Sequence, residues 1–288
     1  MKLVVLGSNG QLGTDICDTL LQEGHDVVRL THADIEISNP ESVSRAFGGK
    51  KLDAVVNTAA MHHVERCEDD PSRAFAINAV GVRNLVRTCD ENGAYFLHIS
   101  TDYVFDGAKG KPYVESDAPR PLNVYGNSKL AGEHFVLTQC REGAVLRVSG
   151  VFGSHPCRAK GGMNFVQLML KLAGERPEIR VVDDEILTPT YTDDIARQVS
   201  VLLKERTPGL FHGTAQGECS WFDFAKEIFA MTRTKANLQP ARPGEFPAKV
   251  PRPRYSVLDN AGLKKAGLDM MPMWQRGLRS YLAEVGAL

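Results

Sequence analysis

The stretch Lys2-Leu3-Val4-Val5-Leu6-Gly7-Ser8-Asn9-Gly10-Gln11-Leu12-Gly13 opens the chain and decides its fold. Residues 2–6 form a short, continuous apolar run, which is typical of a strand buried on both faces. Apolar residues then recur at helical spacing from Leu12 to Leu20, and Gly24 ends the predicted helix. A glycine-rich turn between a buried strand and a helix exposes backbone N–H groups at the positive end of the helix dipole. Such a turn is suited to binding a pyrophosphate.

The glycines Gly7, Gly10 and Gly13 give this turn the spacing G-x-x-G-x-x-G, which differs from the commonest dinucleotide-binding pattern, G-x-G-x-x-G. Taken alone, the spacing also fits a simple tight turn. The strand before it, the helix after it and a second apolar run at residues 26–30 favour a dinucleotide site. Neither Arg nor Lys occurs at residues 31–34, and no acid stands there before the last position, so both NADP and NAD remain candidates for the cofactor.

Strand-like and helical segments alternate through the first half of the chain. Strands are predicted at residues 2–6, 26–30, 52–56, 95–99 and 144–148, and the longest helices between them at 70–92 and 126–140. This alternation is typical of an α/β fold with a doubly wound, Rossmann-like parallel sheet and right-handed crossovers. We expect an NAD(P)-binding Rossmann domain at residues 1–150 and a smaller C-terminal substrate-binding lobe at 151–288. Part of 188–212 is expected to return to the sheet, and 155–162 to form a basic, glycine-rich loop.

The segment from Ser100 to Glu133 carries the candidate chemistry. Tyr125 and Lys129 are four residues apart on a predicted helix and therefore share one face. Thr101 ends the predicted fourth strand, at the sheet edge where open α/β sheets bind ligands. A tyrosine with a pKa of about 10 is a poor acid at neutral pH, and we expect the Lys129 ammonium to lower the pKa of Tyr125. Hydride transfer to a ketone and proton transfer from Tyr125 would then yield an alcohol.

The pattern Y-x-x-x-K also occurs by chance, as a surface tyrosine beside a solvated lysine. Three features of the surrounding sequence favour catalysis over this alternative. They are the glycine-rich turn after the first strand, the Ser-Thr pair that ends the fourth strand, and the helix that follows. In addition, the small residues Ala59 and Ala60 follow the third strand, where they let a flat ligand approach the backbone closely.

Composition excludes several classes of function. Hydrophobic residues make up 43% of the 288 residues and charged residues 24%, as in an ordinary globular protein. The formal net charge is −1, from 34 basic and 35 acidic residues, which indicates neither a nucleic-acid partner nor a membrane surface. The six cysteines are scattered and form no CxxC pair, so we expect buried reduced thiols, no metal site and a cytoplasmic location.

Taken together, these motifs resemble those of the extended short-chain dehydrogenases/reductases, and most closely those of the dTDP-4-dehydrorhamnose reductase family. The Ser100–Gly107 run and the Tyr125–Glu133 segment are the most specific of them. The resembling segments span nearly the whole chain in the family's order: Gly7–Gly13, Ala59-Ala60, 64–68, Asn78-Ala79, Ser100–Gly107, Tyr125–Glu133, Pro189-Thr190, Arg252-Pro253 and Ser256–Asp259.

The resemblance implies a reductase of dTDP-rhamnose biosynthesis that converts dTDP-4-dehydro-L-rhamnose to dTDP-L-rhamnose with NADPH or NADH. By position, the implied catalytic residues are Thr101, Tyr125 and Lys129. The implied cofactor contacts, besides Tyr125 and Lys129, are Gly7, Gly10, Gln11, Leu12 and Gly13 at the pyrophosphate, Glu36 and Ile37 at the adenosine, and Ala59 and Ala60 at the cofactor's middle. The predicted substrate contacts are His62, Thr101, Tyr103 and Gly150.

Two positions depart from the family's pattern: Gly150 stands where a tryptophan is frequent, and Met61-His62-His63 replaces a segment that often carries a threonine. His62 is therefore open to two interpretations, a substrate contact or a solvated loop histidine. The sugar also stays open, since another deoxysugar or ketone fits the same chemistry. A further alternative is a non-catalytic, NADP-binding regulatory subunit resembling the β subunit of methionine adenosyltransferase. The oligomeric state is open too, with a homodimer among the arrangements the sequence allows.

Overall fold

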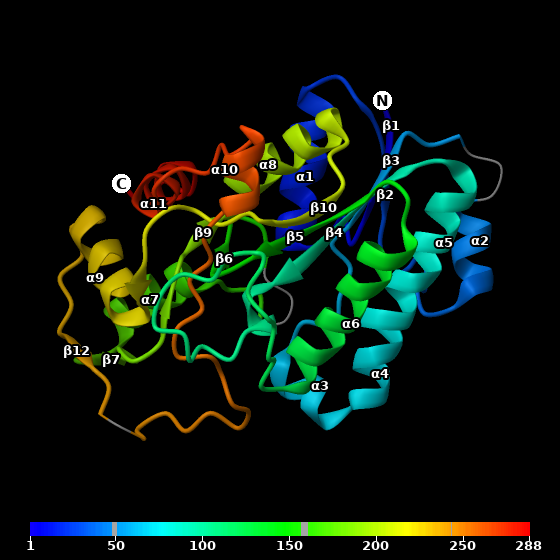
Figure 1. The fold of residues 1–288 in the computed structure, drawn as a ribbon. Helices are drawn as coiled ribbons and strands as arrows, with labels where there is room; N and C mark the ends of the chain where they lie inside the picture. The colour runs from blue at the N-terminus through cyan, green and yellow to red at the C-terminus, as the bar shows by residue number, and fades with distance from the viewer. Residues whose placement is uncertain (48–50, 157–160, 243) are drawn as a thin grey trace.

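The structure, a computed structural model, describes residues 1–47, 51–156, 161–242 and 244–288. Within these residues the centre is a six-stranded sheet with the strand order β10-β5-β4-β3-β1-β2 (Figure 1). Every neighbouring pair in it is parallel. Its strands are β1 (Lys2–Leu6), β2 (Asp26–Leu30), β3 (Ala54–Asn57), β4 (Tyr95–Thr101), β5 (Gly143–Val148) and β10 (Gly209–His212). The predicted α/β fold with a Rossmann-like sheet is confirmed.

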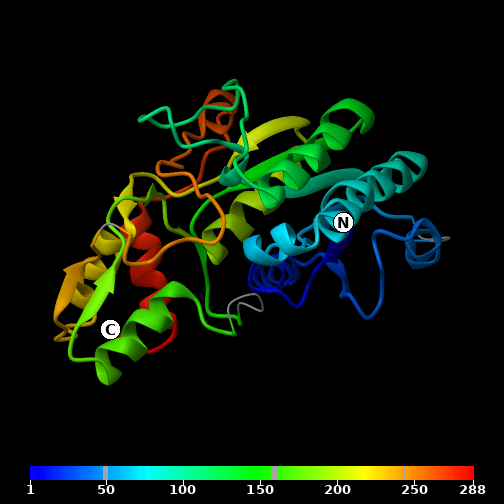
Figure 2. The same ribbon diagram turned by 90° about the horizontal axis from the view of Figure 1, so that it is seen from below.

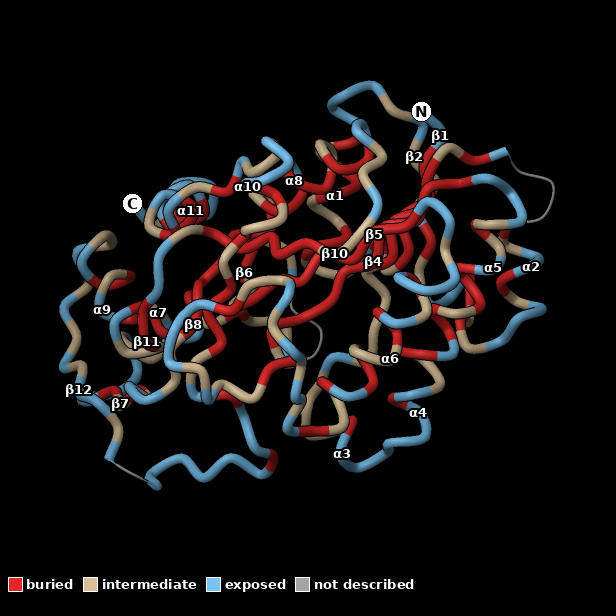
Figure 3. Tube along the Cα trace, viewed as in Figure 1, coloured by how far each residue is buried: buried red, intermediate tan, exposed pale blue. Residues whose placement is uncertain are grey.

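Helices cover both faces of this sheet and bury its inner strands, whereas the edge strands β2 and β10 are only partly buried (Figure 3). On one face lie α1 (Gln11–Gln22) and α8 (Thr192–Glu205); on the other lie α2 (Pro40–Phe47), α5 (Val82–Asn92) and α6 (Val124–Gln139). Successive strand residues point to opposite faces. Leu3 and Val5 therefore join the core beneath α1 and α8, whereas Val4 and Leu6 join the core beneath α2, α5 and α6.

Most of the chain after residue 150 forms a smaller lobe, which lies on the side toward which β4 and β5 point (Figures 1 and 2). Its core is rich in aromatic rings, with Phe152 packed against Phe224 and Tyr281. Its helices are α7 (Phe165–Glu175), α9 (Trp221–Met231) and α11 (Trp274–Glu284). Its paired strands are β6 (Val151–Phe152) with β9 (Thr190–Tyr191), β7 (Ile179–Val181) with β12 (Leu238–Pro240), and β8 (Ile186–Leu187) with β11 (Cys219–Ser220). Residues 157–160 of the loop expected at 155–162 lie outside the described residues.

Two predicted helices differ from the structure in detail. The single helix expected at 70–92 is divided into α4 (Pro71–Phe75), a π-helical turn η1 (Ala76–Gly81) and α5. Such π-turns arise within α-helices and are frequent at functional sites. The helix expected at 126–140 begins at Val124 because the side chain of Asn123 caps it, accepting a hydrogen bond from the Gly126 N–H at 2.9 Å. The short helix α3 (Val64–Asp69) was not predicted.

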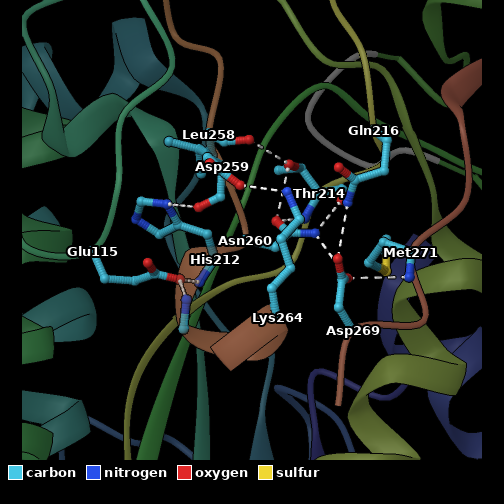
Figure 4. A network of polar contacts seen from close by, with 11 residues as sticks. Glu115, His212, Thr214, Gln216, Leu258, Asp259, Asn260, Lys264, Asp269 and Met271 are labelled. Carbon is cyan, nitrogen blue, oxygen red and sulfur yellow. Dashed lines mark hydrogen bonds and ion pairs between the residues drawn. The ribbon is translucent and has the colours of Figure 1, made fainter. Parts of the chain in front are cut away.

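A buried polar network fastens the C-terminal segment to the edge strand β10 (Figure 4). Asn260 donates to the Thr214 carbonyl at 2.8 Å and to Asp269 at 3.1 Å. Glu115 accepts from the His212 N–H at 2.9 Å, and the His212 ring contacts the Asp259 carbonyl at 3.1 Å. The short helix α10 (Ala261–Ala266) follows this network directly. The segment is therefore held against the strand next to β5.

Of the six cysteines, Cys17, Cys67, Cys89 and Cys219 are buried free thiols and Cys140 is partly buried. The expectation of buried, reduced thiols is confirmed for the first four, Cys140 is a free thiol that is only partly buried, and Cys157 lies outside the described residues. Among the described residues, no helix combines the length and the apolar character that a membrane crossing requires.

Candidate active site

The turn after β1 has a backbone conformation that requires its glycines. Gly7 has φ +73°, and a Cβ on Gly13 would lie 2.2 Å from the Gly7 carbonyl oxygen. Gly10 occupies the N-cap of α1, where within the described residues no side chain caps the helix. The first backbone N–H groups of α1 are therefore left without a side-chain partner among the described residues, beside three glycines that add no side chain at positions 7, 10 and 13. This geometry fits a pyrophosphate.

Gln11 and Leu12 have structural contacts of their own. The Gln11 amide donates to the carbonyls of Gly153 and His155, at 3.1 and 3.0 Å, and so ties the turn to the chain after β6. Leu12 belongs to the core beneath α1. Any contact of these two residues with a pyrophosphate would therefore use their backbone N–H groups.

The end of β2, where an adenosine ribose would lie, carries acids that take part in local turns. Asp34 accepts hydrogen bonds from the Thr31 N–H and hydroxyl, at 2.8 and 2.7 Å, which lowers the pKa of its carboxyl. Glu36 accepts from the Ser38 N–H and hydroxyl, at 3.1 and 2.8 Å. Ile37 is buried. These contacts favour neither NAD nor NADP.

The chain after β3 passes close to the glycine turn. The Thr58 hydroxyl donates to the Leu6 carbonyl at 2.6 Å, and a Cβ on Gly7 would lie 3.0 Å from the Ala59 nitrogen. Ala59 and Ala60 are both half-buried. The structure thus brings together the glycine turn and the Ala59-Ala60 pair, as a cofactor that spans both would require.

Thr101 and Tyr125 meet at the end of β4. A side-chain hydrogen bond joins Thr101 to Tyr125. The approach depends on two glycines of α6, because a Cβ on Gly126 would lie 2.2 Å from the Tyr103 carbonyl, and one on Gly132 would lie 2.3 Å from the Asn78 carbonyl. Glycine at these two positions lets α6 pack closely enough for the phenol to reach the strand.

Lys129 does not act on Tyr125 as expected. Its side-chain nitrogen Nζ contacts His98 Nε2 at 3.1 Å and donates to the Ile99 carbonyl at 2.7 Å, both on β4. Burial raises the pKa of Tyr125, and the hydrogen bond with Thr101 offsets this only in part. Burial also lowers the pKa of Lys129 to about 8. The expectation that Lys129 lowers the pKa of Tyr125 is therefore wrong for the protein without ligands: burial determines it, and the lysine is turned toward the sheet.

Several polar residues of the site were missed by sequence reasoning. Asp102 is buried and accepts hydrogen bonds from Ser149 at 2.8 Å and from Thr101 at 3.0 Å, which fixes the Thr101 hydroxyl. Burial raises the pKa of this carboxyl. Asn78 of η1 joins the loop before α3 to α6, since its amide donates to the Met61 carbonyl at 2.9 Å and to the Ser128 hydroxyl at 3.0 Å. Asp102 and Asn78 both lie in segments that carry the family resemblance, which was the available signal.

The predicted substrate contacts are spread around Tyr125. The Tyr103 ring lies edge-on to the Tyr125 ring, 5.8 Å away between centroids. His62 is exposed and its ring contacts the Ala60 carbonyl at 3.4 Å. Gly150 has φ +58°, and a Cβ there would lie 2.5 Å from the Thr188 carbonyl, so a larger residue would require a different backbone path. Their roles toward a substrate stay predictions.

A charged pair, formed by residues of two segments that carry the family resemblance, lies near Tyr103. Arg252 donates to Glu65 at 2.6 Å, and its charge also acts on Tyr103 and Glu185. Within the described residues, no group of three or more His, Cys, Asp or Glu side chains is arranged to hold a metal ion.

The fold and the site define an extended short-chain dehydrogenase/reductase: a Rossmann-like sheet, a glycine turn at α1, and a Thr-Tyr-Lys set at the carboxyl edge. Comparison with known proteins narrows the class. The chain belongs to the family described as RmlD substrate binding domain, whose model matches residues 1–287.

Named relatives agree with this assignment. The spore coat polysaccharide biosynthesis protein SpsK of Bacillus subtilis is 38% identical over 98% of this chain and 97% of its own length. The dTDP-4-keto-6-deoxy-D-glucose reductase of Streptomyces niveus is 34% identical over 96% of this chain and 95% of its own. The crystal structure of dTDP-4-dehydrorhamnose reductase from Bacillus anthracis in complex with NADP superimposes with a TM-score of 0.93, at 35% identity, covering 99% of this chain and all of that one.

Proposed function

We propose that this protein is an NADPH- or NADH-dependent reductase of a 4-keto nucleotide sugar, with dTDP-4-dehydro-L-rhamnose as the first candidate and dTDP-L-rhamnose as its product. The observation that carries the proposal is the hydrogen bond between Thr101 and the half-buried Tyr125, on the sheet edge that also bears the glycine turn. Relatives with reductase names, one of them solved with NADP, support the same activity.

In this proposal the chain's own residues bind the cofactor, orient the keto sugar and supply a proton. The cofactor, held by the glycine turn and the Ala59-Ala60 segment, supplies a hydride to the keto carbon when it is bound. Thr101, whose hydroxyl donates to Asp102 in the free protein, turns its proton to the keto oxygen, and Tyr125 transfers its hydroxyl proton to that oxygen as the alcohol forms. Lys129 holds the ribose next to the nicotinamide and provides positive charge near the phenol.

The smaller lobe, at 151–288, is proposed to bind the nucleotide part of the substrate over the carboxyl edge of the sheet. Besides Thr101, Tyr103 is a proposed substrate contact near the reacting point, because its ring packs edge-on against the Tyr125 ring. His62 and Gly150 are proposed contacts from the two loops that flank it. A relative named for a different keto sugar keeps a second substrate, dTDP-4-keto-6-deoxy-D-glucose, in consideration.

The test is oxidation of NADPH and NADH by the purified protein, followed by absorbance, with each of the two dTDP-keto sugars. Turnover with dTDP-4-dehydro-L-rhamnose in clear preference to the other sugar supports the proposal. Preference for the other sugar keeps the chemistry and changes the substrate. Absence of turnover with either, together with NADPH binding and a co-purifying protein, would favour the regulatory-subunit alternative.

A further inference from the structure

A chain of three buried side chains connects two strands of the sheet to the proposed catalytic helix. Asn57 ends β3, His98 lies within β4, and Lys129 lies on α6. The Asn57 amide nitrogen is 3.1 Å from His98 Nδ1, and His98 Nε2 is 3.1 Å from Lys129 Nζ. Asn57 and His98 are 0% exposed and Lys129 is 2% exposed. Because these side chains are shielded from solvent, only neighbouring protein groups determine which atom donates and which accepts in each of these hydrogen bonds.

The backbone fixes which way the Asn57 amide faces. The Ala59 N–H donates to Asn57 Oδ1 at 3.1 Å, so the oxygen is turned to Ala59 and the NH₂ group to His98. His98 Nδ1 must then accept a hydrogen bond. Burial lowers the pKa of His98 well below its usual range, so the ring is neutral and carries one proton. With Nδ1 as the acceptor, that proton resides on Nε2.

The His98 Nε2–H points at Lys129 Nζ, and this has a consequence for the charge of the lysine. An ammonium group has three donors and no acceptor, so it would oppose a donor with a donor. A neutral amine has a lone pair that accepts from Nε2–H, while one of its N–H groups donates to the Ile99 carbonyl at 2.7 Å. Only the neutral amine satisfies all of these contacts.

Other groups around α6 act on the lysine from a greater distance. Glu133, one helical turn further on, raises the pKa of Lys129, but its carboxylate accepts two hydrogen bonds from Arg147. The titratable or charged groups that act on Tyr125, Lys129 or Glu133 from neighbouring elements are Cys67 of α3, His98 of β4, Asp102 of η2 (Asp102–Val104) and Arg147 of β5. Toward η1 the contact to α6 is made by the neutral Asn78.

We propose that His98, oriented by Asn57, is a positioning residue that favours the neutral amine of Lys129 in the free protein, so that at alkaline pH binding of the reduced cofactor is coupled to uptake of a proton. The proton comes from solvent and ends on Lys129 Nζ, where it gives the ammonium that the proposed function uses beside Tyr125. The inference rests on that proposed function for the role of Lys129. The inference concerns cofactor binding, whereas the proposed function concerns turnover, so either can fail while the other stands.

The measurement is calorimetric titration of NADPH into the protein, at each pH in two buffers of different ionisation enthalpy, which gives the protons taken up. Because the pKa of Lys129 is about 8, about nine in ten free chains carry a neutral lysine at pH 9 and about one in ten at pH 7. We expect uptake near one proton per chain at pH 9 and about a tenth of that at pH 7. The phosphates of NADPH are fully ionised at pH 9 and do not contribute.

Two variants separate positioning from packing. In His98→Gln the amide can turn its oxygen to Lys129, so the lysine stays protonated in the free protein and uptake at pH 9 falls several-fold. The matched control is His212→Gln, which replaces another buried histidine of the same sheet and should retain the wild-type uptake. Wild-type uptake in His98→Gln, or no uptake at pH 9 in the wild type, would overturn the proposal.

Nitrogen-15 NMR of the histidine rings in the unmodified protein provides a test that does not depend on a variant folding. The expected result is a proton on Nε2 of His98 and a bare Nδ1; a proton on Nδ1 would contradict the inference. If NADPH binds with the expected uptake but no keto sugar is reduced, the proposed function fails and this inference stands. Turnover without proton uptake would overturn this inference and leave the proposed function standing.

Discussion

Glu133 of α6 and Arg147 of β5 form a buried, two-pronged ion pair: Arg147 Nε lies 2.9 Å from Glu133 Oε1, and Nη2 lies 2.6 Å from Oε2. Their side chains are 1% and 2% exposed. Ser100, the residue before Thr101, also donates to Oε1 at 2.5 Å. Because Tyr125 and Lys129 lie on the same helix as Glu133, this pair fastens the proposed catalytic helix to the strands that carry Thr101 and its neighbours.

Removing one partner of this pair should destabilise the protein strongly. Glu133→Gln leaves the Arg147 guanidinium buried without a counter-charge, and breaking a buried pair in this way costs about 3–5 kcal/mol. Urea unfolding should show a lower midpoint with an unchanged slope. The control is Glu175→Gln, which breaks the exposed Lys171–Glu175 contact of 3.9 Å and should leave the midpoint unchanged. Similar midpoints for the two variants would contradict a structural role for the buried pair.

The local parts of the fold and site follow from sequence patterns. Gly7 to Gly13 between an apolar run and a helical period predicts the turn, and the spacing of Tyr125 and Lys129 places both on one helix face. The spacing does not show what the lysine meets across the interface. His98 looks like any residue of a buried strand in the sequence, and its pairing with Lys129 exists only because β4 lies beneath α6.

Burial explains the other differences. The prediction that Lys129 lowers the pKa of Tyr125 took account of these two side chains alone. The free-energy cost of ionising the phenol also depends on how far the surrounding residues shield it from water. Glu133 and Arg147 belong to separate segments, and no local pattern marks either as a buried charge. The π-helical turn at Ala76–Gly81 likewise follows from packing, because it places Asn78 between Met61 and Ser128.

The glycine turn yields a prediction about cofactor binding. In Gly13→Ala the new Cβ would lie 2.2 Å from the Gly7 carbonyl, so the turn must shift and the backbone N–H groups lose their alignment. We expect at least a tenfold loss of NADPH affinity, measured by calorimetry. Gly174→Ala in α7 is the control, since a Cβ there meets nothing within 4 Å. If Gly13→Ala binds NADPH as the wild type does, the turn is not the pyrophosphate site.

Tyr125→Phe should separate turnover from binding. It removes the hydroxyl group that donates the proton and keeps the ring against Tyr103. We expect kcat to fall by about 10²–10⁴-fold, the usual contribution of a positioned acid, with NADPH affinity nearly unchanged. Steady-state kinetics and calorimetry on the same preparation measure both quantities. A rate close to that of the wild type would show that the proposed proton path is wrong.

Lys129→Met should damage both binding and turnover, in contrast to Tyr125→Phe. The substitution removes the group proposed to hold the cofactor's ribose and the charge beside the phenol, while a methionine of similar length fills the buried space. We expect a rise in the Kd for NADPH together with a fall in kcat. A loss of kcat alone would limit the lysine to the proton path, and a loss of affinity alone would limit it to binding.

The final prediction concerns stability in acid and rests on His212. Burial, with the nearby Arg147 charge, lowers the pKa of His212 to about 3 from a usual value of 6.5. Between these two values the unfolded chain binds a proton that the folded protein excludes. Because the unfolded state then holds more protons than the folded state, the free energy of unfolding decreases as the pH falls. The contribution of His212 is therefore complete above pH 6.5 and is lost progressively toward pH 3.

For one such histidine, the loss between pH 6.5 and 5.5 is about 1 kcal/mol. Urea unfolding of the wild type and of His212→Gln at these two values measures it. The glutamine variant should start less stable at pH 6.5, because it loses contacts with Arg147 and the Asp259 carbonyl, and should then fall by about 1 kcal/mol less than the wild type over that interval. An equal loss of unfolding free energy in both proteins would mean that His212 takes up its proton in the folded protein as readily as in the unfolded chain. In that case its ring would not accept a hydrogen bond from Arg147.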